Sequence, residues 1–275
     1  MRIGFVGAGK VGCSLGSYFA QQHTIVGYAS KSSCSADEAA QLTGSHAFRS
    51  VLELARNCDM IFFTVPDGAI EQAWLDFSSN ASADVLQGKM VAHCSGAMPS
   101  TVFEDAAQHG VSAYSVHPLF AVSSRTVPIE ELSKAFFTIE GSPERLDEVS
   151  AFINGLGNSF QVVQASDKTR YHAAAALASN HVVALYRIAC NELMRCGFSD
   201  ADAEQAMAPL FLGNAQHIAH DGVVEALTGP AERGDYATID KHLACLDGST
   251  KDVYRLLNEV LLDIAQEKRA LHRNV

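Results

Sequence analysis

The chain has 275 residues, of which 48% are hydrophobic and 19% charged, so it can bury a substantial core and is not a disordered tail. Its 20 Lys and Arg residues against 31 Asp and Glu give a formal net charge of −11. Nucleic acids and anionic membrane surfaces are bound through positive charge, so this composition argues against both as partners. The most apolar stretch, residues 173–189, is interrupted by polar and charged side chains, and we expect that it does not span a membrane.

The seven cysteines are scattered, odd in number and form no CxxC pair. They predict neither a disulfide framework nor a zinc site, and reduced thiols are typical of cytoplasmic proteins. Residues 1–9 have the pattern of a strand that enters a glycine-rich turn, not that of a signal peptide. We therefore expect a cytoplasmic protein.

The first half alternates short apolar runs with helical patterns. The runs predict buried strands at 2–6, 24–29, 60–65, 89–93, 112–116, 136–140 and 160–163. The segments between the first of them predict crossover helices at 11–22, 36–42, 51–57 and 69–78. Such alternation is typical of a doubly wound, mostly parallel sheet.

The pattern changes after residue 165. No Gly or Pro occurs between Asp167 and Cys196, which predicts a long helix, and further helices are expected from Ser199 and from Ser249 to about His272. No strand is predicted after Val163. The fold class is thus α/β, with a Rossmann-type doubly wound domain at residues 1–165 followed by an all-helical domain at residues 166–275.

A glycine-rich turn follows the first predicted strand and begins the first helix. In a dinucleotide site the first glycine makes the tight turn, the second lets the backbone approach the pyrophosphate, and the third lets helix and strand pack closely. The helix N-terminus then offers free N–H groups to the phosphates. The segment predicted to bind the dinucleotide is Gly7-Ala8-Gly9-Lys10-Val11-Gly12.

The end of the second predicted strand bears on the choice of dinucleotide. An acidic residue there would hold the ribose 2′-hydroxyl of NAD, but the loop reads Ser30-Lys31-Ser32 and no carboxylate occurs before Asp37. A lysine between serines suits a 2′-phosphate, so we expect NADP. The alternative, a solvated loop that merely lacks an acid, stays open, and the loop holds no Arg.

Two further strand ends are expected to line the cofactor, because ligands of such sheets bind at the carboxyl ends of the strands. Val65 and Pro66 end one strand, and Ser95 and Gly96 follow another. We expect Ser95 and Gly96 to face the ribose–nicotinamide half.

The candidate catalytic residues at the start of the long predicted helix are Lys168, Tyr171, His172, Ser179 and Asn180. Reduction of a carbonyl or imine requires a proton donor or cation at the developing negative charge. Lys168, His172 and Ser179 share one face at helical spacing, and Asn180 lies to one side of it. A Lys and a His one turn apart in a cleft are expected to lower each other's pKa. His117, at the end of another strand, is a further candidate.

Other polar features are weaker. The turn-rich stretch 227–235 is either a substrate loop or a connector between helices. His217 and His220 lack further partners at ligand spacing, so we expect surface histidines and no metal site.

Five segments together resemble a family of bacterial Rossmann-like oxidoreductases whose C-terminal helical domain is of unknown function. They are GAGKVG, HCSGA, SVHPLFAV, KTRYHAAAALASN and ALTGPAERGD, in that order. More distantly, the chain is similar to the 6-phosphogluconate dehydrogenase-like group, which includes ketopantoate reductases and pyrroline-5-carboxylate reductases. This resemblance implies that the helical domain forms a homodimer and completes the active site.

In ketopantoate reductases and β-hydroxyacid dehydrogenases the long helix carries a Lys and, four residues later, an Asn. Lys168 matches this pattern, but the fourth residue on is His172, so either His172 or Asn180 takes the role of that Asn. The resemblance implies an NADP-dependent reductase of a small, ketopantoate-like 2-oxo acid. The alternatives are a cyclic imine reductase of the pyrroline-5-carboxylate type and a non-catalytic NADP(H)-binding sensor.

Overall fold

A computed structural model describes residues 1–272 of the chain. The chain divides into two compact units, Met1–Ser179 and Asn180–Val275. The predicted boundary after residue 165 falls earlier than this division. Helix α8 (Lys168–Leu177), the first of the predicted helical domain, belongs to the first unit, because its opening turn is anchored on the sheet by Lys168.

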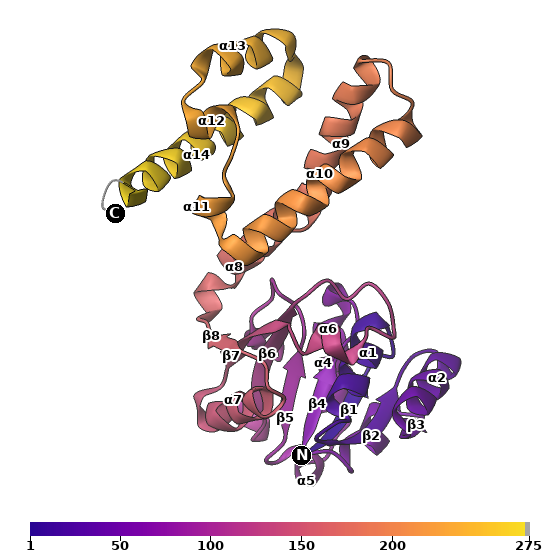
Figure 1. The fold of residues 1–275 in the computed structure, drawn as a ribbon. Coiled ribbons are helices and arrows are strands. Elements are labelled where there is room, and N and C mark those ends of the chain that lie inside the picture. The colour runs from indigo at the N-terminus through magenta and orange to yellow at the C-terminus, as the bar shows by residue number, and fades with distance from the viewer. Residues whose placement is uncertain (273–275) are drawn as a thin grey trace. The chain divides into compact units, whose positions relative to one another are not determined.

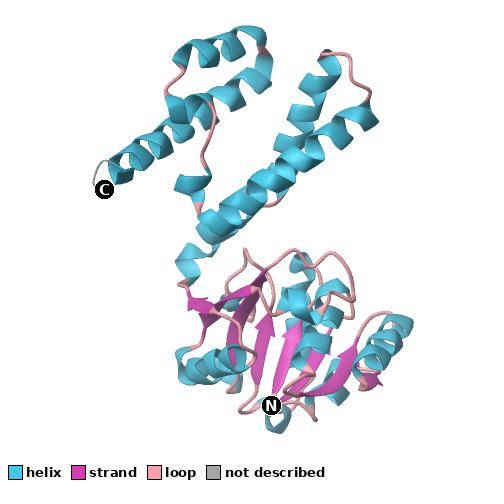
Figure 2. Ribbon diagram, in the orientation of Figure 1, coloured by secondary structure: helices cyan, strands magenta, loops and turns pink. Residues whose placement is uncertain are grey.

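The first unit is built on one eight-stranded sheet in the order β3-β2-β1-β4-β5-β6-β7-β8, which confirms the predicted Rossmann fold (Figures 1 and 2). All paired strands are parallel except β6 and β7. The strands are β1 (Arg2–Val6), β2 (Thr24–Ala29), β3 (His46–Phe48), β4 (Met60–Phe63), β5 (Met90–His93), β6 (Ser112–Leu119), β7 (Phe136–Gly141) and β8 (Phe160–Val162).

Helices cover both faces of the sheet and divide the core into two clusters (Figure 2). One face packs against α1 (Lys10–Phe19), α2 (Ser33–Thr43), α6 (Ile129–Leu132) and α7 (Leu146–Gly155). The other packs against α3 (Val51–Ala55), α4 (Ile70–Ser78) and α5 (Ala83–Leu86). Apolar side chains alternate between the two clusters along each strand, as in a sheet buried on both faces. In β1, for example, Phe5 stacks on Tyr28 and Phe62 while Val6 lies in the opposite cluster.

Among the strands that the structure describes, β3 is the one that the sequence pattern does not predict. It has three residues, of which His46 and Ala47 are exposed, so it lacks the apolar run of a buried strand. It pairs with β2 at a point of very close backbone approach, where a β-carbon at Gly27 would lie 1.9 Å from the carbonyl oxygen of His46. Glycine at position 27 therefore permits this edge strand to join the sheet.

The predicted long helix is interrupted. Helix α8 ends at Leu177 and α9 begins at Asn180, with a turn at residues 178–179 between them. The Ser179 hydroxyl donates to the carbonyl of Ala175 at 2.7 Å, a bond that competes with the regular backbone pattern of a helix.

The second unit is helical, as predicted. Its elements are α9 (Asn180–Arg195), α10 (Asp200–Asp221), α11 (Val223–Ala226), α12 (Pro230–Arg233), α13 (Tyr236–Cys245) and α14 (Gly248–His272). The predicted start of α10 is confirmed, because Ser199 Oγ accepts the N–H of Asp202 at 3.2 Å. Helix α14 runs to His272, the last residue that the structure describes.

Residues 165–195, which include α8, the turn after it and α9, are by length and composition alone apolar enough to cross a membrane; the structure describes no other such segment within residues 1–272. The polar residues within it do not lower its mean hydropathy enough to exclude a span, contrary to the sequence-based expectation. Only 6% of its most apolar window is buried.

Candidate active site

The glycine-rich turn after β1 has the geometry of a dinucleotide-binding turn. Gly7 has φ +104°, and a β-carbon there would lie 2.9 Å from the backbone of Thr64. A β-carbon at Gly12 would lie 2.5 Å from Thr64 Oγ1, so helix α1 packs tightly on β4. Gly9, by contrast, faces open space, and no atom lies within 4 Å of the position that its β-carbon would take. The three glycines thus fit the three roles of a pyrophosphate-binding turn.

Helix α1 starts at this turn. Gly9 is its N-cap, and no side chain within residues 1–272 caps the helix N-terminus. Its first N–H groups are therefore available to an anion. Ala8 is buried, Lys10 is exposed and Val11 packs on the core, so the predicted segment combines structural and ligand-facing positions.

The loop after β2 lies beside this turn, because Gly7 N donates to the carbonyl of Ala29 at 2.8 Å. Ser32 caps helix α2 by accepting the N–H of Ser35 at 3.2 Å. Lys31 is exposed and Ser30 partly so. The loop can thus present an ammonium group and serine hydroxyls to a ligand.

The turn after β5 is held by buried polar groups. Ser95 N donates to His93 Nδ1 at 3.1 Å, and Ser95 Oγ donates to Asp67 Oδ2 at 2.6 Å. His93 Nδ1 is an acceptor, so the proton lies on Nε2 and is donated to the carbonyl of Pro99 at 3.2 Å. Ser95, predicted to face a cofactor, is itself buried and orders this turn. The predicted Val65 and Pro66 follow β4 and lead into Asp67.

Lys168 is anchored beneath the same turn. Its side chain is 1% exposed, and Nζ donates to the Ser95 carbonyl at 3.0 Å and to Ser115 Oγ at 2.7 Å. Burial lowers the pKa of Lys168 to about 8, an effect that the nearby Glu140 carboxylate partly opposes. The main cause is therefore desolvation rather than the expected repulsion by His172. Lys168 ties α8 to the ends of β5 and β6.

A buried carboxylate holds the far end of the loop that follows β5. Glu140, 5% exposed, accepts the Ser100 N–H at 2.6 Å and the Ser100 hydroxyl at 2.8 Å. The loop from Ser95 to Ser100 is therefore secured at both ends by ionisable groups, Lys168 at one and Glu140 at the other.

Two imidazoles converge on Gly96 in this loop, and a tyrosine contacts one of them. A β-carbon at Gly96 would lie 2.9 Å from His117 Nε2 and 2.9 Å from His172 Cδ2. His117 Nδ1 lies 2.7 Å from the hydroxyl of Tyr171, and the two rings meet edge to face. Glycine at position 96 therefore leaves the room that both imidazoles occupy.

The protonation states within this cluster follow from burial. Desolvation lowers the pKa of His117 to about 4, with smaller contributions from Lys168 and His172. Burial also raises the pKa of Tyr171, so its hydroxyl keeps the proton. At neutral pH His117 is therefore a neutral imidazole and Tyr171 a neutral phenol, so either group can donate in the 2.7 Å hydrogen bond between them.

The structure thus brings together His117, His172, Tyr171 and Lys168, all of them candidates from the sequence, and it adds His93 and Asp67 to their surroundings. Ser179 turns its hydroxyl to its own helix, and Asn180 begins the second unit.

His93 gives the site a measurable pH dependence. Burial lowers its pKa to about 4 from 6.5, so the unfolded chain binds more protons between those values and the free energy of unfolding falls as the pH decreases from 6.5 to 4. We expect His93→Gln to reduce this loss by about 2–3 kcal/mol, as measured by urea unfolding across that range. His217→Gln, at an exposed position in α10, is the control. If the free energy of unfolding depended on pH equally in the wild type and in His93→Gln, the prediction would be contradicted.

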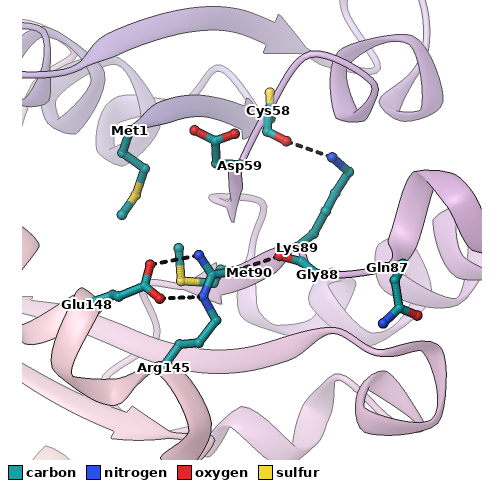
Figure 3. A pocket seen from close by; sticks show the side chains of 9 residues that line it. All are labelled: Met1, Cys58, Asp59, Gln87, Gly88, Lys89, Met90, Arg145 and Glu148. Atoms are coloured by element: carbon teal, nitrogen blue, oxygen red, sulfur yellow. Dashed lines mark hydrogen bonds and ion pairs between the residues drawn. The ribbon is translucent and has the colours of Figure 1, made fainter.

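A separate pocket of about 460 Å³ lies at the amino ends of the strands, whereas the cluster at Gly96 lies at their carboxyl ends (Figure 3). Its lining includes residues that immediately precede β1, β4 and β5. The main cations there are already engaged, since Lys89 Nζ donates to the Cys58 carbonyl at 2.7 Å and Arg145 binds Glu148 and the Gly88 carbonyl. This pocket therefore offers little free hydrogen-bonding capacity to a ligand.

Comparisons with known proteins agree with the two-part organisation. Residues 1–118 match the model of a Rossmann-like domain, and residues 135–260 match that of a domain of unknown function, DUF2520. The search of curated proteins found no similar sequence.

Solved structures share the fold over nearly the whole chain. A protein from Thermotoga maritima aligns with a TM-score of 0.75 at 23% identity, over 97% of this chain and 99% of that one. A protein from Bacteroides fragilis, assigned as an NADP oxidoreductase, gives 0.66 at 23% identity, over 95% and 98%. The pyrroline carboxylate reductase of Plasmodium falciparum, solved with NADP bound, gives 0.58 at 13% identity, over 96% and 98%. The chain therefore combines a Rossmann-like domain with a C-terminal region that matches DUF2520, and it shares its fold with these three proteins.

Proposed function

We propose that the protein is an NADPH-dependent reductase of a small compound with a C=O or C=N bond. The observation that carries the proposal is the convergence of His117 and His172 at Gly96, at the carboxyl end of the strands that also carry the glycine-rich turn. Ligands of doubly wound sheets bind at this edge. A reductase needs its proton donors beside the nicotinamide, and in this proposal the nicotinamide would lie beside the cluster.

NADP is the proposed cofactor. The turn at Gly7, Gly9 and Gly12 would hold the pyrophosphate, and Ser30, Lys31 and Ser32 would hold the 2′-phosphate. The Bacteroides and Plasmodium proteins of the same fold are an NADP oxidoreductase and a reductase with NADP bound, which supports this choice.

The chemistry of the residues suits proton delivery. Bound NADPH would supply the hydride to the unsaturated carbon. His117 Nε2–H would donate its proton to the substrate oxygen or nitrogen, and the Tyr171 hydroxyl would replace it through Nδ1. Lys168 would act through the loop that it anchors, because its Nζ is buried and bonded to Ser95 and Ser115. His172, which is exposed, would contact the substrate, with Ser179 and Asn180 as further candidates for substrate binding.

Two substrate classes follow from different observations. The sequence pattern around Lys168 suggests a ketopantoate-like 2-oxo acid. The shared fold of the pyrroline carboxylate reductase favours a cyclic imine. A neutral imidazole donor is compatible with either class, so the two are separated by experiment.

The proposal is tested first by NADPH binding, followed through the change in nicotinamide fluorescence, and then by NADPH oxidation at 340 nm. Oxo acids and cyclic imines form the substrate panel. Turnover of one class identifies it. Tight NADPH binding without oxidation by any panel member, together with a change of oligomeric state, would favour the sensor and contradict the reductase.

We also propose that the second unit forms a homodimer. Large apolar side chains are exposed along its helices, among them Val183 at 70% and Leu210 at 68% exposure, whereas few residues of the unit are buried. An apolar groove of about 280 Å³ runs between α9 and α14, lined by Leu185, Ile188 and Leu257. Exposed apolar area of this extent is typical of a protein interface.

Light scattering after size exclusion is expected to give twice the mass of one chain for the wild type. Leu210→Glu would place a charge in the proposed interface, and the dimer dissociation constant should rise by a factor of about 10 to 100. Lys251→Glu, at an exposed polar position of α14, is the control. A wild type that runs as a monomer at micromolar concentration would refute the dimer.

A further inference from the structure

The carboxyl end of β3 brings an arginine to the edge where the proposed 2′-phosphate site lies. In the parallel pairing of β2 with β3, Ala29 lies opposite Phe48. The next residues, Ser30 and Arg49, therefore leave the sheet side by side, since neighbouring strands are about 4.8 Å apart. The loop after β2 lacks an arginine, and the neighbouring strand supplies one.

Local contacts hold the backbone at Arg49 in place. The close approach of Gly27 to His46 sets the pairing of the two strands. Beyond β3, Ser50 caps α3 by accepting the N–H of Glu53 at 3.2 Å, and Glu53 Oε2 accepts the N–H of Arg49, also at 3.2 Å. Arg49 is thus presented from a defined strand end, although its side chain is exposed.

The charges at this edge are available to a ligand. The Lys31 ammonium and the Arg49 guanidinium make no hydrogen bond or ion pair with any residue in the part of the chain that the structure describes. Arg125, which also reaches α2, differs from them. Its guanidinium pairs with Glu38 and donates to the Ser35 carbonyl and to Cys13 Sγ, so it is already engaged.

We propose that Arg49 and Lys31 bind the 2′-phosphate of NADPH from two adjacent strands, with Arg49 as the main determinant of NADPH over NADH. The planar fork of a guanidinium binds two phosphate oxygens at once, whereas an ammonium acts as a point charge. This inference rests on the proposed function, because it requires the dinucleotide to lie along the glycine-rich turn.

The test is the affinity of Arg49→Gln for four probes: NADPH, NADH, 2′,5′-ADP and 5′-AMP, measured by calorimetry. NADPH and 2′,5′-ADP are expected to bind roughly ten- to hundredfold more weakly than to the wild type, while NADH and 5′-AMP bind unchanged. Arg49→Lys should restore only part of the affinity, because the charge returns without the fork. Arg56→Gln removes one positive charge from the C-terminal end of α3 and is the matched control.

The outcomes separate the two proposals. A wild type that binds none of the four probes overturns the reductase proposal and this inference with it. A wild type that prefers NADPH while Arg49→Gln keeps the same preference overturns only the role of Arg49. Equal loss of NADPH and NADH affinity in Arg49→Gln would show that Arg49 supports the fold of the loop rather than the phosphate, and would also overturn it. Circular dichroism of each variant verifies that it is folded.

Discussion

Tyr171→Phe is expected to lower kcat/KM by about 100- to 10,000-fold while NADPH binds with unchanged affinity. The substitution keeps the ring that packs edge to face on His117 and lies 5.7 Å from Lys168 Nζ. It removes only the hydroxyl that lies 2.7 Å from His117 Nδ1 and is its proposed proton donor. Without this donor the imidazole loses the group that sets its tautomer and replaces its proton, so proton delivery to the substrate should fail.

Steady-state kinetics with the substrate found in the panel, together with NADPH titration, measures this effect. Tyr236→Phe, at an exposed tyrosine of α13, serves as the control. His117→Asn should cause a loss of similar size, and Tyr171→Phe combined with His117→Asn should be little worse than either alone, because the two residues act as one unit. Unchanged turnover in Tyr171→Phe would remove the proposed relay.

Lys168→Met is expected to have the second largest effect, on both activity and the pH dependence of stability. Methionine fills the volume but removes the ammonium that donates to both the Ser95 carbonyl and the Ser115 hydroxyl, so that only the 3.2 Å bond from Ser115 Oγ to the Ser95 carbonyl remains. The loop and the first turn of α8 should then shift, and kcat/KM should fall by about 10- to 100-fold, because misplaced catalytic groups are costly.

The pH dependence of stability distinguishes a desolvated lysine that holds the loop from a side chain that only fills space. The pKa of Lys168 is lowered to about 8 from 10.5, so between these values the unfolded chain holds more protons and the free energy of unfolding rises with pH. The difference in the free energy of unfolding between the wild type and Lys168→Met should therefore increase by about 1–3 kcal/mol between pH 8 and 10.5. Urea unfolding at several pH values measures it, and a difference independent of pH would show that Lys168 is not held in a desolvated site.

The sequence alone predicts the fold well because its strongest signals are local. Strands β1, β4 and β5, which lie next to one another in that order, are short apolar runs. The glycine spacing after β1 is typical of one structure, a dinucleotide-binding turn. The helix from Ser199 is recognised by its cap. Strand β3 is missed, since three residues with an exposed start carry no such pattern, and Arg49 is missed with it.

The candidate site is predicted only in part, because its partnerships depend on which strand ends meet in space. The sequence singles out His117 and His172 as ionisable residues at the ends of predicted elements. Their convergence depends on Gly96, because a side chain at that position would collide with both imidazoles. Glu140 lies within a strand and has no spacing relation to Ser100, yet it binds that residue. Lys168 has the predicted position on α8, but its burial, on which the proposed anchoring role rests, depends on the packing of α8 on the sheet.

The glycines of the turn after β1 differ in whether the fold itself requires them. At Gly7 and Gly12 a side chain would collide with Thr64, so the fold itself demands glycine. Gly9 has an ordinary extended backbone at φ −82° and open space around it, so an alanine there would disturb no neighbour in the protein. The open space at Gly9 is where the proposed dinucleotide would approach the backbone. A side chain at position 9 would therefore weaken the proposed binding, whereas one at position 7 or 12 would destabilise the fold.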